Sequence, residues 1–319
     1  MHLYQDERLM AYFFTASFND QKDLYKKLQA LKALQQGQMS FMGIDFEFNS
    51  KNSIRVIASM QTTFYIRGKK YNYIFNPDTM LKHVKSYLIQ HFLTNLSVYK
   101  ILHGSESLDI YYLIFFLGER KKVDLMMKRY YDTKLLCEYE KYKYGVKMKC
   151  NIYDLLYSKN VITKEIYDFL LKNEKKVGPV YKIEIILENY NKRLFCYMVY
   201  DSFYLLELFL AFKSLTTKEI IMFQNVVHMS FMNLTAGDKF PVKFGSLGKK
   251  DNLYQKLFTK MIEGPYDIGD LYKGVPFFKK IIKAYFRFLF ECGDHTLPFK
   301  VMKQMLQKKR LFQKMMLKI

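Results

Sequence analysis

The chain has 319 residues, half of them hydrophobic, which excludes a disordered protein and allows one large domain with a smaller one. Its 51 lysines and arginines outnumber its 30 aspartates and glutamates, and the net charge of +21 predicts attraction to nucleic acid or an anionic membrane. The longest apolar run, 110–117, is shorter than the roughly 20 residues of a spanning helix, and the N-terminus lacks a signal-peptide pattern. We therefore expect a soluble intracellular protein, cytoplasmic or nuclear, without a transmembrane segment.

The first 120 residues alternate between predicted strands and helices. Apolar patterns predict strands at 9–17, 43–48, 53–63 and 98–102, and a hairpin of 63–66 with 71–75 around Arg67-Gly68. Helical patterns predict helices from Asn19-Asp20 to about 36, from Asn76-Pro77-Asp78 to about 93, and over 107–117. Strands come first and helices then alternate with strands, which favours an α/β fold with a mixed sheet covered by helices.

The predicted strand that begins at Gly43 carries two acids. Asp45 and Glu47 share one face of it, while Ile44 and Phe46 fill the other. An unpaired buried carboxylate is costly, and the usual remedies are a basic partner, a hydrogen-bond network or a divalent metal. Alone, such a pair is more often salt-bridged or exposed to solvent, so a metal site needs support from the rest of the sequence.

The cysteines show no paired spacing, which is typical neither of a zinc site nor of a disulfide framework. They are Cys137, Cys150, Cys196 and Cys292. We expect all of them to be reduced, mostly buried thiols.

Beyond 213 the pattern becomes helical, with predicted helices at 217–232, 252–263 and 276–291. The last segment, 300–319, holds seven lysines or arginines and no acid, and has the pattern of a basic amphipathic helix. Its basic face is either simply solvated or contacts nucleic acid, a membrane or a protein partner. We therefore divide the chain into an α/β domain over 1–213 and a basic helical domain over 214–319.

Three further stretches complete a pattern with the acidic strand. A His103-Gly104 turn leads into an apolar helix with Asp109 at its start, Asp132-Thr133 follows a short strand, and Tyr197 and Asp201 lie four apart on a helix. In this order the motifs resemble the DEDD superfamily of 3′-to-5′ exonucleases, in the tyrosine branch that includes ribonuclease D. The resemblance covers roughly 12–210.

The sequence departs from the family pattern at one position. The family usually places its second aspartate five residues after the turn histidine, whereas Asp109 lies six after His103 and Leu108 occupies the usual place. A one-residue insertion in the turn restores Asp109, and Glu106 is the alternative. His103 itself is expected to be a structural turn residue, and Asp132 to hydrogen-bond a loop.

The resemblance implies a ribonuclease H-like fold and a site for two Mg²⁺ or Mn²⁺ ions, which prefer oxygen ligands. It implies that Asp45 bridges the two ions, that Glu47 and Asp201 hold the ion that activates water, and that Asp109 assists the other. Tyr197 would orient the water and would not act as a base, because an ordinary phenol with a pKa of about 10 stays protonated at neutral pH.

The function that follows is a two-metal exonuclease that hydrolyses nucleic acid from the 3′ end, with RNA slightly preferred over single-stranded DNA. Its basic surface would draw in the phosphate backbone. The alternative is a catalytically inactive nucleic-acid-binding scaffold or adaptor of the same fold. An anionic-membrane adaptor that uses the basic tail is a third interpretation, supported by charge alone.

Overall fold

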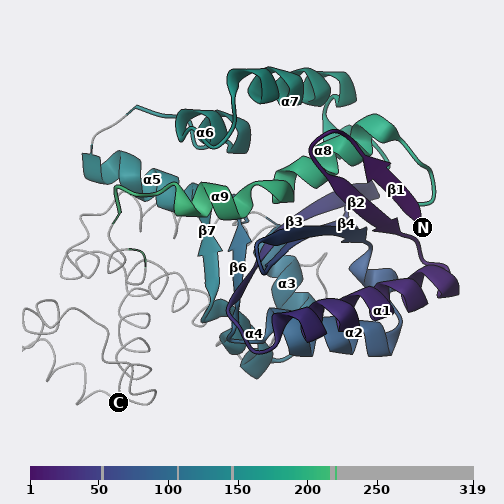
Figure 1. Cartoon of the computed structure of the whole chain (residues 1–319). Helices are drawn as coiled ribbons and strands as arrows, with labels where there is room; N and C mark the ends of the chain where they lie inside the picture. The colour runs from purple at the N-terminus through teal and green to yellow at the C-terminus, as the bar shows by residue number, and fades with distance from the viewer. Residues whose placement is uncertain (52–53, 106–107, 145–146, 216–219, 221–319) are drawn as a thin grey trace, which may run out of the picture.

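A computed structural model describes residues 1–51, 54–105, 108–144, 147–215 and 220. Within these ranges one sheet runs through the centre of the molecule, with helices on both of its faces (Figure 1). Its strands are β1 (His2–Gln5), β2 (Met10–Phe14), β3 (Ser40–Lys51), β4 (Ile54–Ile66), β5 (Lys69–Phe75), β6 (Val98–Leu102) and β7 (Tyr130–Asp132). The helices are α1 (Phe18–Gln35), α2 (Lys82–Leu88), α3 (Asp109–Leu117), α4 (Arg120–Met127), α5 (Thr133–Tyr144), α6 (Ile152–Ser158), α7 (Lys164–Val177), α8 (Lys192–Phe203) and α9 (Leu205–Leu210).

The strand order is β1-β2-β5-β4-β3-β6-β7. The long strands β3 and β4 pair antiparallel, as do β4 and β5, whereas β3, β6 and β7 run parallel. A meander followed by two parallel strands on the other side of its first strand is the arrangement of the ribonuclease H-like fold. The predicted fold class is therefore confirmed.

The short hairpin of β1 and β2 extends this sheet at one edge, where β2 pairs parallel with β5. Strand β1 is not among the predicted elements, because it is a four-residue edge strand with only one buried residue, Tyr4. Asp6, in the turn between the strands, accepts hydrogen bonds from the hydroxyls of Tyr4 and Tyr200. The added hairpin thus contacts α8.

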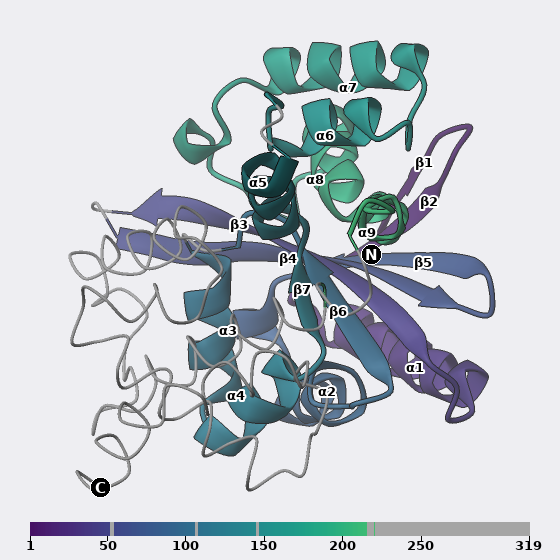
Figure 2. The same ribbon diagram turned by 90° about the vertical axis from the view of Figure 1, so that its left-hand side faces the viewer.

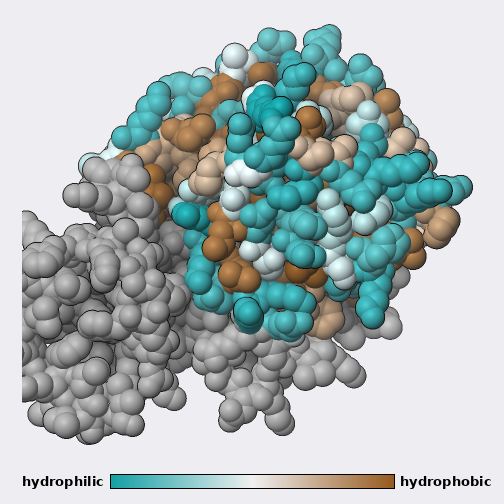
Figure 3. Space-filling view, turned by 60° about the horizontal axis from the view of Figure 1, so that its bottom comes forward, coloured by the Kyte–Doolittle hydropathy of each residue, from teal (hydrophilic) through white to brown (hydrophobic). Residues whose placement is uncertain are grey.

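The helices form two layers. Helices α1 to α4 cover one face, and α5, α8 and α9 lie on the other, with α6 and α7 farther out (Figure 2). In α1 the side chains of Leu24, Leu28 and Leu31 recur at helical spacing and are all buried against the sheet. The outer surface of this layer is mostly hydrophilic, with separate hydrophobic patches (Figure 3).

Two predicted helix starts differ from the structure. Ser17, and not Asn19 or Asp20, caps α1, because Asp20 is instead buried and accepts hydrogen bonds from Thr15. Asn76 caps only a 3₁₀ turn at Pro77–Thr79, and α2 begins five residues after Pro77. Both caps were predicted from local sequence, but the carboxylate of Asp20 instead accepts hydrogen bonds from Thr15 and from the N-terminal amino group.

The prediction of four reduced cysteines is wrong. Cys137 of α5 and Cys150, just before α6, form a disulfide with a Cα–Cα distance of 5.8 Å. The chain turns back between α5 and α6, so residues 13 apart meet without any short spacing motif. Cys196 is a free, buried thiol as expected, and Cys292 lies outside the described residues.

The predicted helical domain over 214–319 falls almost entirely outside the described residues, as do the predicted helices within it. The basic segment 300–319 also lies outside them. Within the described ranges no helix combines the length and the apolar character needed to cross a membrane.

Candidate metal centre

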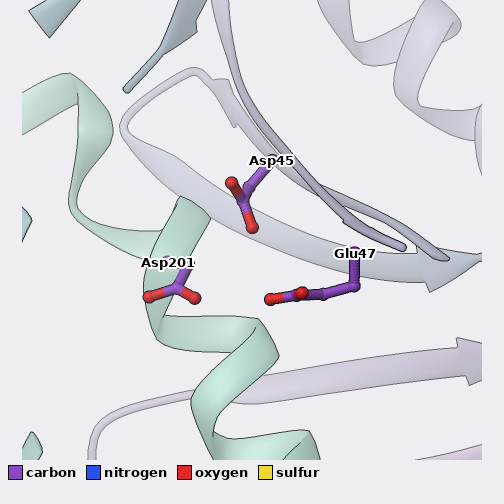
Figure 4. Close-up of side chains that lie close together, drawn as sticks. All are labelled: Asp45, Glu47 and Asp201. Atoms are coloured by element: carbon purple, nitrogen blue, oxygen red, sulfur yellow. The ribbon is translucent and has the colours of Figure 1, made fainter. Parts of the chain in front are cut away.

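The centre of the candidate site lies where β3 faces α8. Strand alternation turns Asp45 and Glu47 toward α8 and buries Ile44 and Phe46 on the opposite face of the sheet. One carboxylate oxygen from each of Asp45, Glu47 and Asp201 lies within 4.8 Å of the others. Their side chains point toward one another across the space between strand and helix (Figure 4). Three of the predicted metal ligands therefore converge.

Helix α8 reaches β3 closely because Gly43 has no side chain. A Cβ atom at this position would lie 2.7 Å from the backbone oxygen of Ser202, which leaves no room for it. The end of α8 is further fixed by hydrogen bonds from β4 and β5: the hydroxyl of Thr63 contacts that of Ser202 at 3.1 Å, and Lys70 Nζ donates to the Phe203 carbonyl at 3.1 Å. These contacts place Asp201, one residue before Ser202, beside the acidic strand.

The three carboxylates are unfavourable neighbours at neutral pH. Burial raises the pKa of Asp45 well above its usual range, and the charge of Asp109 raises it further. Burial also raises the pKa of Glu47 and of Asp201, and in each case Asp45 is the largest additional cause. Among the described residues no lysine or arginine forms an ion pair with any of these three acids.

Asp109 is the first residue of α3 and is nearly buried. Its charge raises the pKa of both Asp45 and Glu47, which places it beside them, although it is not one of the three acids whose oxygens converge. The turn before it is fixed by Asp132, which accepts hydrogen bonds from the backbone N–H groups of Gly104 and Ser105 at 3.0 and 2.9 Å. The expected structural role of Asp132 is confirmed.

His103 is also structural. Its Nδ1 lies 2.9 Å from the hydroxyl of Thr133, and burial lowers the pKa of the imidazole to about 4. At neutral pH the ring is therefore uncharged, which fits a residue that packs and hydrogen-bonds in a turn.

Tyr197 lies one helical turn before Asp201 on α8, as the spacing predicts. Its hydroxyl lies close enough to Glu47 and Asp201 to lower the pKa of both acids. The charge of Asp201, followed by burial, raises the pKa of Tyr197 far above the usual value, so the phenol stays protonated. It can hold a polar group at the site but cannot serve as a base.

Two residues near the site were missed by the sequence analysis. The hydroxyl of Tyr153, on α6, donates to Asp201 Oδ1 at 2.7 Å. Gln61 of β4 stands directly opposite Asp45 in the strand register, and its side chain is completely buried. Strand alternation opposite Asp45 could have indicated Gln61, whereas no local pattern distinguishes Tyr153 from the other 26 tyrosines.

The residues present fit a divalent cation. The convergent donors are all carboxylate oxygens, which Mg²⁺ and Mn²⁺ prefer, and no basic partner neutralises them among the described residues. The Oε1 atom of Gln61 is buried without a hydrogen-bond partner, and a water molecule on a cation could donate to it. Of the three remedies for buried acids, a metal is the one that this donor set favours.

No protein-family model matches the chain. Over 118 residues, or 36% of the chain, it is 30% identical to "Uncharacterized protein L533" of Acanthamoeba polyphaga mimivirus. The chain spans less than a quarter of that relative, 23% of its length.

Several solved structures are similar to it at low sequence identity, and they include the following two. An RNase D of Trypanosoma brucei in complex with RNA U12 is 13% identical, with 72% of each chain covered and a TM-score of 0.47. The Nibbler EXO domain of Aedes aegypti is 12% identical, with 73% of this chain and 99% of that one covered and a TM-score of 0.44.

Proposed function

We propose that this chain is a metal-dependent exonuclease of the tyrosine branch of the DEDD superfamily, which hydrolyses nucleic acid from its 3′ end. The observation that carries the proposal is the convergence of Asp45, Glu47 and Asp201 on a ribonuclease H-like sheet without a basic partner among the described residues. The phenol of Tyr197 lowers the pKa of two of the three. We propose RNA as its preferred substrate and single-stranded DNA as the second.

Each residue has a role in the proposed site. Asp45 would bridge two Mg²⁺ or Mn²⁺ ions, Glu47 and Asp201 would hold one of them, and Asp109 would assist with the other. Bound in this way, two ions stabilise the attacking and leaving oxygens of an in-line displacement. Tyr197 would accept or donate a hydrogen bond at the attacking water and keep it in line with the scissile phosphate, without taking its proton.

The raised pKa values of the three acids support this assignment. Each acid holds its charge less readily than a free carboxylate, and bound cations would favour the charged forms that serve as ligands. Excess basic residues elsewhere in the chain would attract the phosphate backbone and make binding depend on salt.

The experiment is degradation of 5′-labelled single-stranded RNA and DNA by the full chain in Mg²⁺ or Mn²⁺, with EDTA as a control. We expect products that shorten from the 3′ end, faster on RNA, and none with EDTA or with the Asp45→Asn variant. Glu119→Gln is the matched control, because Glu119 is an exposed acid at the start of α4 in the opposite helical layer.

Intact oligonucleotide that remains bound in every metal would contradict the exonuclease and support the inactive scaffold. Products that arise from internal cuts, as an endonuclease gives, would contradict the 3′-end mechanism.

A further inference from the structure

Side chains from two parts of the fold lie beside the carboxylate of Asp201. Asp45 and Glu47 approach it from the sheet, whereas Tyr153 approaches from α6 in the outer helical layer (Figure 2). The Tyr153 hydroxyl lies 2.7 Å from Asp201 Oδ1, and the ring is 4% exposed. This hydrogen bond joins residues 48 apart in sequence and is not part of the acidic motifs.

We propose that Tyr153 is a positioning residue, whose hydrogen bond to Oδ1 fixes the carboxylate of Asp201 in the orientation that a divalent cation requires. The proposal rests on the proposed function, because it assumes that Asp201 is a metal ligand. One oxygen of Asp201 is directed toward Glu47, which is the orientation that the bond would preserve (Figure 4).

A phenol suits this task better than a basic side chain. Lysine or arginine would neutralise Asp201 and compete with a cation for it, whereas a hydroxyl orients the carboxylate and leaves its charge in place. Burial and the charge of Asp201 raise the pKa of Tyr153 well above the usual value, so the group remains a donor at any physiological pH. Hydrogen-bonded partners of metal-binding carboxylates commonly act in this way.

Tyr153 and Tyr197 differ in what they touch. Tyr197 lies on α8 itself, one turn before Asp201, and lowers the pKa of both Glu47 and Asp201. The hydroxyl of Tyr153 donates to Asp201 on α8 from a different helix. The two phenols therefore act on Asp201 from different helices.

The start of α6 is itself fixed. Asn151 caps the helix by accepting a hydrogen bond from the Asp154 N–H, and Cys150 is joined to Cys137 of α5 by the disulfide. Tyr153 follows two residues after this cap. A side chain on an anchored helix can hold its partner in one orientation at a low cost in entropy.

The test is a calorimetric titration of the full chain with Mn²⁺ alone, comparing wild type with Tyr153→Phe, which removes only the hydroxyl. We expect the dissociation constant to rise about tenfold or more, with no change in the affinity for oligonucleotide measured in EDTA. Tyr157→Phe is the matched control, because Tyr157 lies on the same helix, is 40% exposed and stacks on Tyr167. This control should bind Mn²⁺ as wild type does.

A second measurement tests the proposal even if Tyr153→Phe is less stable than wild type. Mn²⁺ raises the thermal midpoint of a protein according to its affinity for the folded state, so the rise should be smaller for Tyr153→Phe than for wild type. Equal Mn²⁺ affinity and equal thermal shifts would overturn the positioning role and leave the exonuclease proposal intact. Wild-type protein that binds no Mn²⁺ would overturn both.

Discussion

Asp132 and Asp201 are both buried carboxylates, at 3% and 7% exposure, but their surroundings are opposite. Asp132 receives hydrogen bonds from backbone N–H groups and from the Ser105 hydroxyl, and these bonds and neighbouring His103 lower its pKa despite burial. Asp201 lies beside two other acids and its pKa is raised. Several donors thus stabilise the charge of Asp132, whereas Asp201 accepts one hydrogen bond from Tyr153 and keeps two acidic neighbours that a cation would neutralise.

The largest expected effect is a loss of activity when one of the three convergent acids is replaced. Asp45→Asn removes the charge that the proposed ions would share, and we expect exonuclease activity to fall about 10³-fold or more. Initial rates on 5′-labelled RNA measure the loss. Activity within tenfold of wild type would show that the convergent acids are not catalytic.

The next largest expected effect is a loss of stability when Asp132, the hydrogen-bonded acid, is replaced. Asp132→Ala leaves the Gly104 and Ser105 donors of the turn before Asp109 without an acceptor, and we expect the free energy of unfolding to fall by about 3 kcal/mol or more. Urea unfolding monitored by circular dichroism measures it. A loss below about 1 kcal/mol would mean that Asp132 does not maintain the turn.

A smaller effect is expected where α8 meets the sheet. Gly43→Ala introduces a Cβ atom 2.7 Å from the Ser202 carbonyl, so α8 must move away from β3. We expect stability to fall by about 1–3 kcal/mol and Mn²⁺ affinity to fall with it, because Asp201 moves with the helix. Thermal unfolding with and without Mn²⁺ separates the two losses, and an unchanged Mn²⁺-induced shift would contradict the link between them.

The smallest expected effect is an increase in stability, whereas most substitutions decrease it. In EDTA, Asp45→Asn should stabilise the protein at neutral pH by about 0.5–2 kcal/mol, because it removes repulsion among the acids. The matched Glu119→Gln control should not. Thermal unfolding across a pH series measures the difference, and a destabilised Asp45→Asn protein at every pH would show that the cluster is not repulsive.

The pH dependence follows from the directions of the pKa shifts. Raised folded-state pKa values of the three acids contribute stability that is fully present below about pH 4 and is lost as pH rises through those values, so the advantage of Asp45→Asn should grow with pH. The lowered pKa of Asp132 has the opposite sign: its contribution is present above about pH 4 and is lost as pH falls through the folded value.

The parts of the site that could be predicted are those encoded by short-range patterns. Alternation in β3 placed Asp45 and Glu47 on one face, and a four-residue spacing placed Tyr197 beside Asp201 on α8. The order of strands and helices also indicated the fold class.

The parts that could not be predicted depend on contacts between distant segments. Tyr153 reaches Asp201 only because α6 packs outside α8, and Cys137 meets Cys150 only because the chain reverses between two helices. The role of Gly43 depends on how closely Ser202 approaches, which no spacing in the sequence encodes. Hydrogen bonding in the folded state also shifted the start of α1 from the predicted cap to Ser17.

Anomalous diffraction from crystals of the full chain grown with Mn²⁺ would show directly whether a metal binds at this site. We expect manganese peaks within coordination distance of Asp45, Glu47 and Asp201, at about 2.0–2.3 Å from their oxygens. Crystals that show no manganese at these acids, or a lysine or arginine side chain paired with them in its place, would contradict the claim that this is a metal centre.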